Sequence, residues 1–123
     1  MAKLLIVEDD ESVRTLAARA LERAGHSIDI AANGAQGLAM ISAAGGGYDL
    51  VVSDIRMPEM DGIEMAIAAA RLFPAMKILL MTGYADQRER AEELNGIIID
   101  VVQKPFTLAE IRSRVEQALA CFA

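Results

Sequence analysis

Short runs of hydrophobic residues recur along the chain, and after each run the spacing of the hydrophobic positions changes. Within a run the hydrophobic positions are nearly continuous and do not alternate with polar ones. Over so few residues, this pattern is typical of a strand that is buried on both faces of a parallel sheet. The pattern therefore predicts five strands, over residues 3–7, 27–31, 48–53, 77–81 and 97–103.

The stretches between these runs have the spacing and the end signals of helices. The first carries a hydrophobic stripe at intervals of three and four residues, and Gly25 follows as its end. Three later stretches begin at residues whose side chains can cap a helix, and a fourth is strongly charged. The caps are Asn33, Asp61–Glu64 and Thr107–Glu110, and the charged helix is predicted over Gln87–Leu94.

Five strands that alternate with five helices indicate a doubly wound α/β fold with a parallel sheet and right-handed crossovers. The length of 123 residues is that of one domain. The chain is 54% hydrophobic, enough to fill a core of its own. We therefore expect a single domain over residues 1–123, with no second domain.

The charge of the chain narrows the classes of partner. With 18 acidic and 12 basic side chains the net charge is −6, which disfavours a nucleic-acid surface. The single cysteine, Cys121, cannot form an internal disulfide and fits a reducing compartment. The first residues do not resemble a signal peptide, and the uncharged stretch 30–48 is too rich in glycine to span a membrane. We expect a soluble, cytoplasmic protein.

Chemically reactive residues follow the predicted strands at their carboxyl ends, where open α/β sheets bind ligands. Carboxylates gathered at one edge repel each other unless a cation is bound, and Mg²⁺ suits oxygen ligands completed by water and phosphate. One carboxylate could then act as a nucleophile toward phosphorus, while a lysine and a hydroxyl neutralise the transferred group. These residues are Glu8-Asp9-Asp10, Asp54, Thr82 and Lys104.

The same residues lie in motifs through which the chain resembles the receiver domains of two-component response regulators, over essentially all 123 residues. The motifs are Leu5–Asp10 with Arg14 downstream, Ser53–Gly62, Leu80–Gly83 and Gln103–Phe106. The second motif is highly specific, and all four occur in order after a predicted strand. The resemblance implies a flavodoxin-like (βα)5 fold with strand order 2-1-3-4-5, of the single-domain, chemotaxis-regulator-like kind without an output domain.

The resemblance also implies a metal site. Asp9 and Asp54 would bind Mg²⁺ directly, the backbone carbonyl of Arg56 would be a third ligand, and Glu8 would act through water. Asp10 is expected to cap the first helix, and Asp61 is expected to be a helix cap and not a ligand.

Asp54 would accept the phosphoryl group from a histidine kinase or a histidine phosphotransfer protein. Lys104 would pair with the phosphate, its peptide bond to Pro105 would be cis, and Thr82 would move toward the phosphoryl oxygens. The family often has an aromatic residue where this chain has Val101, which makes a threonine–aromatic relay doubtful. Tyr84 is a hypothetical substitute gate.

The leading hypothesis is a phosphorylation-controlled switch that is not an enzyme and signals by protein–protein contact through its helix-four, strand-five, helix-five surface. An alternative is a phosphorelay intermediate that passes the group to another histidine. A third, an aspartyl phosphatase, usually needs an acid where this chain has Arg56. His26 is expected to be an exposed loop residue without a function.

Overall fold

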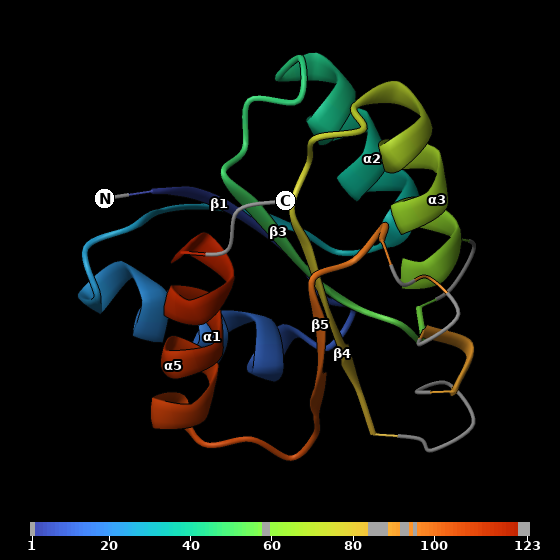
Figure 1. The fold of residues 1–123 in the computed structure, drawn as a ribbon. Helices are drawn as coiled ribbons and strands as arrows, with labels where there is room; N and C mark the ends of the chain where they lie inside the picture. Colours follow the sequence, from blue (N-terminus) through green and yellow to red (C-terminus); the bar gives the residue numbers. More distant parts are fainter. Residues whose placement is uncertain (1, 58–59, 84–88, 92–93, 95, 121–123) are drawn as a thin grey trace.

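The fold is a five-stranded parallel sheet between two layers of helices (Figure 1). A computed structural model describes residues 2–57, 60–83, 89–91, 94 and 96–120. The strand order is β2-β1-β3-β4-β5, so the predicted fold class and strand order are confirmed. The strands are β1 (Lys3–Val7), β2 (Ser27–Ala31), β3 (Leu50–Asp54), β4 (Ile78–Thr82) and β5 (Asp100–Gln103).

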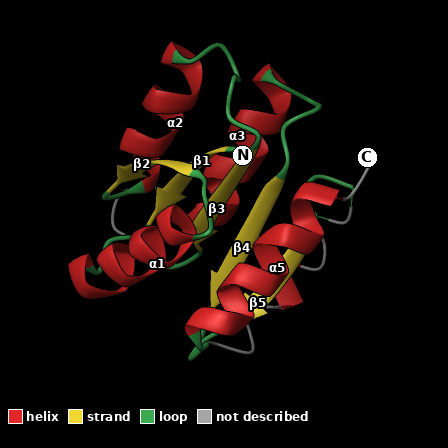
Figure 2. Ribbon diagram, turned by 90° about the vertical axis from the view of Figure 1, so that its left-hand side faces the viewer, coloured by secondary structure: helices red, strands yellow, loops and turns green. Residues whose placement is uncertain are grey.

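Two hydrophobic cores lie on opposite faces of the sheet, because its strands are apolar on both sides. Helices α1 (Glu11–Arg23) and α5 (Leu108–Ala120) cover one face. Helices α2 (Gly34–Ala43) and α3 (Gly62–Leu72) cover the other. Figure 2 shows the two pairs on either side of the strands. None of the helices in the described ranges has the length and apolar character needed to cross a membrane.

The helices begin where the capping residues predict. Asp10 accepts hydrogen bonds from the backbone N–H groups of Ser12 and Val13. The predicted capping boxes are both present: each cap side chain accepts from the backbone of the following glutamate, whose side chain accepts from the backbone of the cap. They are Asp61 with Glu64 and Thr107 with Glu110. Of the predicted charged helix, residues 89–91 are helical, and part of the remainder lies outside the described residues.

Three strands are shifted or shorter than predicted. β3 and β4 each begin later than expected and extend to Asp54 and Thr82. β5 begins at Asp100 instead of residue 97, because the N–H groups of Ile97 and Ile98 both donate to the Leu94 carbonyl and so form a turn. Hydrophobic composition alone cannot separate a partly buried turn from the strand that follows it.

On the edge strand β5, the side chains of Asp100 and Arg114 bind each other and the backbone of Val101, an arrangement that we call the fork. The N–H of Val101 donates to Asp100 Oδ1 at 2.8 Å, and its carbonyl accepts from Arg114 Nη2 at 3.2 Å. Arg114 Nε also donates to Asp100 Oδ2 at 3.0 Å. Both main-chain polar groups of Val101 are thus bonded to side chains of the same protein.

Two glycines allow backbones to approach closely near the end of β3. A Cβ atom on Gly62 would lie 2.2 Å from the carbonyl oxygen of Asp54, and one on Gly34 would lie 2.2 Å from that of Met60. Any side chain at either position would collide with backbone. The two glycines therefore allow the segment that follows Asp54 to pack directly against the first residues of α2 and α3.

Candidate functional site

Three carboxylates meet at the carboxyl edge of the sheet. Glu8 and Asp9 follow β1, and Asp54 ends the adjacent strand β3. One carboxylate oxygen from each lies within 4.8 Å of the other two. Asp9 is exposed, whereas Glu8 and Asp54 are buried. The acids line a cavity of about 720 Å³ that Arg56 and Lys104 also line. The structure therefore brings together the acids that the sequence places at separate strand ends.

Lys104 joins the two buried acids. It follows β5, and its Nζ lies 2.6 Å from Glu8 Oε1 and 3.3 Å from Asp54 Oδ1. Its backbone N–H donates to the Thr82 carbonyl at 2.7 Å, and its peptide bond to Pro105 is cis, as predicted. The direct pairing of Lys104 with Glu8 was not predicted, because the sequence offers no signal that selects one acid as its partner.

Burial dominates the electrostatics of the buried acids. Loss of solvent raises the pKa of Glu8 to about 7, against the hydrogen bond from Lys104, which lowers it. Burial also raises the pKa of Asp54, with the charge of Lys104 again opposing. Burial acts to lower the pKa of Lys104, but the bonds and charges of its two partners outweigh this effect and raise it. One ammonium group therefore contacts both buried carboxyl groups.

This donor set fits a hard divalent cation. Mg²⁺ prefers carboxylate and carbonyl oxygens together with water, and the three acids supply oxygen atoms alone. A cation beside Glu8 and Asp54 would favour their ionised forms and offset the cost of burying them. The cluster is therefore compatible with a metal site.

A family model identifies the chain. The model described as "Response regulator receiver domain" matches residues 4–116. The chain belongs to the response regulator receiver family. Receiver domains act in two-component systems, and the predicted resemblance is confirmed.

Known receivers resemble the chain over nearly all its length. The response regulator receiver protein CpdR of Brucella abortus (strain 2308) is 34% identical over 119 residues, which are 97% of this chain and 98% of CpdR. The sensor kinase CckA of the same strain is 33% identical over 118 residues, 96% of this chain, which spans 12% of that kinase. The crystal structure of the response regulator protein TrrA from Thermotoga maritima, in complex with Mg²⁺–BeF, has a TM-score of 0.86 at 31% identity and covers 96% of this chain and 99% of TrrA.

The remaining predicted site residues of the receiver differ in their surroundings. Thr82 ends β4 and is fully buried, and Arg56 is exposed at the cavity. Val101 is buried in the core on the α2–α3 face, so no aromatic side chain occupies that position. Tyr84, the hypothetical gate, lies outside the described residues.

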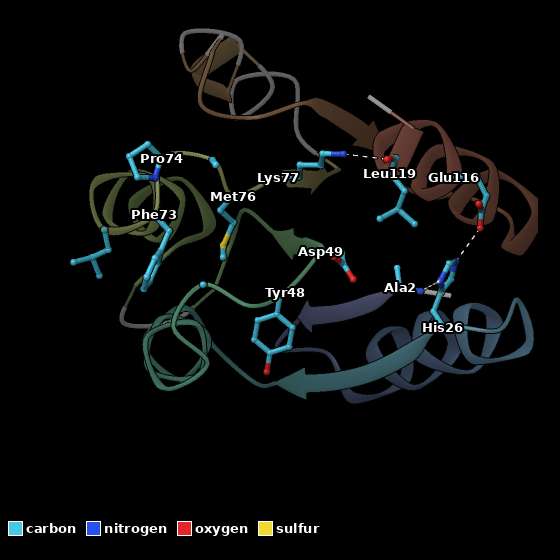
Figure 3. A pocket seen from close by; sticks show the side chains of 13 residues that line it. Ala2, His26, Tyr48, Asp49, Phe73, Pro74, Met76, Lys77, Glu116 and Leu119 are labelled. Carbon is cyan, nitrogen blue, oxygen red and sulfur yellow. Dashed lines mark hydrogen bonds and ion pairs between the residues drawn. The ribbon is translucent and has the colours of Figure 1, made fainter. Parts of the chain in front are cut away.

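The opposite edge of the receiver holds a larger groove of about 820 Å³, at the amino ends of β1, β3 and β4 (Figure 3). The polar groups that line it bond to other groups of the protein: Asp49 accepts from the Lys3 N–H, and Lys77 donates to the Leu119 carbonyl. The acids and the lysine of the carboxyl edge are far better suited to the chemistry of a receiver.

His26 lies in the loop between α1 and β2 as predicted, but the prediction that it is exposed is wrong. Its side chain is 7% exposed. Its Nδ1 accepts a hydrogen bond from the Ala2 N–H at 3.1 Å, and its Nε2 lies 2.9 Å from Glu116 Oε1 (Figure 3). The glycine before His26 indicates a turn. It does not show which distant residues contact the histidine, and these are Ala2 and, on α5, Glu116. His26 ties these three segments together.

Proposed function

We propose that this receiver is a phosphorylation-activated switch that accepts a phosphoryl group on Asp54 from a histidine kinase or a histidine phosphotransfer protein. The observation that carries the proposal is the position of the Asp54 carboxylate among Glu8, Asp9 and Lys104. An oxygen of Asp54 would attack phosphorus, the phosphorus–nitrogen bond of phosphohistidine would break, and its electron pair would return to the imidazole.

Two polar groups of the protein contact Asp54 Oδ1. This oxygen accepts from the Ile55 N–H at 3.0 Å and lies 3.3 Å from Lys104 Nζ. The two contacts fix the Asp54 carboxylate at the end of β3, where it lines the cavity.

Mg²⁺ would be held by Asp9, Asp54 and the backbone carbonyl of Arg56, with Glu8 acting through water, and it would neutralise charge on the transferred group. That TrrA was solved with Mg²⁺–BeF supports this assignment. Lys104 would exchange part of its contact with Glu8 for a phosphoryl oxygen, and the Thr82 hydroxyl would donate to another. In this proposal Lys104 and Thr82 stabilise one transferred phosphoryl group, and no substrate is turned over. The chain then acts as a phosphoacceptor and not as an enzyme.

A second role is that of a phosphorelay intermediate, which would pass the group from Asp54 to another histidine. The match of the chain to a segment of the sensor kinase CckA favours this alternative. The two roles share one site and differ in the acceptor. Transfer of label from the phosphorylated chain to a histidine phosphotransfer protein would establish the relay, and retention of the label would establish the terminal switch.

Intact-protein mass spectrometry tests the site. Incubation with acetyl phosphate and Mg²⁺ is expected to add one phosphoryl group to the wild type and none to Asp54→Asn. Asp49→Asn is the matched control, since Asp49 is an exposed acid at the opposite edge of the sheet, and it is expected to label like the wild type. Labelling of Asp54→Asn, or none of the wild type, overturns the proposal.

A further inference from the structure

The turn that carries Glu8 and Asp9 joins β1 to α1. The Glu8 N–H donates to the Ala31 carbonyl at 3.1 Å, so Glu8 still follows the bonding of the sheet. Asp10 begins α1 as its cap, and its N–H donates to Glu8 Oε2 at 3.3 Å. Asp9 is therefore the one residue between the end of the strand ladder and the helix cap, and it is exposed.

Arg14 bonds to the main chain on both sides of Asp9. Its backbone N–H donates to the Asp10 carbonyl at 2.9 Å, as the first turn of a helix requires. Its side chain is half-buried and reaches further back, where Nη1 donates to the Glu8 carbonyl at 2.9 Å. The second bond is charge-assisted, and such bonds are stronger than those between neutral groups.

The Glu8 carbonyl lies in the same rigid peptide plane as the Asp9 nitrogen and Cα. Fixing that oxygen therefore fixes the plane from which the Asp9 side chain projects. Without the guanidinium, this plane could rotate about its two flanking single bonds while the cap and the strand stay formed. The direction of the Asp9 carboxylate thus depends on Arg14.

We propose that Arg14 is a positioning residue of the acid cluster, which holds the Glu8–Asp9 peptide so that Asp9 faces Glu8 and Asp54. The effect of Arg14 on function rests on the proposed function, because a correctly oriented Asp9 would bind the cation that supports phosphoryl transfer to Asp54. Arg14 itself touches neither the phosphoryl acceptor nor a metal ligand atom, and it acts through the backbone.

The test compares Arg14→Met, which removes the guanidinium and keeps an unbranched apolar stem, with Arg19→Met, the same change at an exposed position of α1. In Mg²⁺ titrations followed by amide chemical shifts, Arg14→Met is expected to weaken binding about 10-fold or more, as loss of a group that orients a ligand does. Arg19→Met is expected to bind like the wild type. In labelling with acetyl phosphate, Arg14→Met is expected to need more Mg²⁺ for half the maximal rate and to reach a similar maximum.

Hydrogen exchange in metal-free protein gives a separate readout. The amides of Asp9 and Asp10 are expected to exchange faster in Arg14→Met, while those inside β1 exchange as in the wild type. Equal Mg²⁺ affinity of the two variants, or uniformly faster exchange across β1 and the turn, overturns the inference. If the wild type binds no Mg²⁺ the proposed function fails, and the exchange pattern still decides whether Arg14 holds the turn.

Discussion

The Tyr48 hydroxyl shows how strongly one buried polar group can respond to its neighbours. Tyr48 is 7% exposed, and its hydroxyl donates to Asp29 Oδ2 at 2.7 Å. Burial first, and then the bond and charge of Asp29, raise the pKa of Tyr48 to about 12. A tyrosinate beside Asp29 would place two negative charges together, so the folded protein favours the neutral hydroxyl.

Stability is therefore expected to fall at alkaline pH, and Tyr48→Phe is expected to reduce that fall. The unfolded tyrosine has a pKa of 10.0 and the folded one about 12. As pH rises through this window the unfolded chain loses its proton first, and the free energy of unfolding drops by up to about 1.4 kcal/mol per pH unit. Below the window the contribution of Tyr48 is fully present. Urea unfolding of both proteins across the window measures the difference.

A spectroscopic control separates the two tyrosines of the chain. Tyr84→Phe leaves Tyr48 as the single tyrosine, and its ultraviolet titration is expected to have a midpoint near 12. A midpoint near the ordinary value, or the same alkaline loss of stability in Tyr48→Phe as in the wild type, would contradict the role given to burial and Asp29.

At the scale of elements, the contact of α2 with the segment after β3 predicts a cost for any side chain at Gly34. Gly34→Ala is expected to destabilise the protein by about 1–3 kcal/mol, because the new Cβ would lie 2.2 Å from the Met60 carbonyl oxygen. Alanine would otherwise favour a helix. Urea unfolding measures the change. Ser42→Ala, at an exposed position of α2, is the control and is expected to stay within about 0.5 kcal/mol of the wild type. A stabilised Gly34→Ala protein would refute the close approach.

The elements themselves were predictable because their signals are local. Asp61 and Glu64 are three residues apart, and the strand runs are short and continuous, so both can be recognised without tertiary structure. The location of the acid cluster was also predictable, since parallel strands bring their carboxyl ends to one edge of the sheet. The pairing of Lys104 with Glu8 joins residues 96 positions apart, and no local pattern determines it. The burial of His26 escaped prediction for the same reason, because Glu116 is 90 positions away.

For the whole molecule, the acid cluster links folding to metal binding. Three carboxyl groups lie together at one edge, a lysine contacts two of them, and unfolding disperses all four groups. A cation that binds only the folded state raises stability by mass action, by about 2.7 kcal/mol at 100 times its dissociation constant. Mg²⁺ is therefore expected to raise the Tm of the wild type and to have little effect on Asp9→Asn.

Thermal unfolding with and without Mg²⁺ makes this comparison, with Asp49→Asn as the control that keeps the cluster intact. An equal rise in Tm for the wild type and Asp9→Asn would show that the stabilisation comes from elsewhere on this acidic protein. A rise in the wild type and Asp49→Asn alone would place the stabilising cation at the carboxyl edge of the sheet.

The fork of Asp100 and Arg114 on β5 also affects the tendency of the protein to aggregate at high concentration. A sheet that ends in an open strand can recruit strands from other molecules and grow into fibrous aggregates. At Val101 the amide and the carbonyl are already occupied from within the chain. An approaching strand must first displace this ion pair, so the fork impedes sideways growth of the sheet and helps to keep the protein dispersed at high concentration.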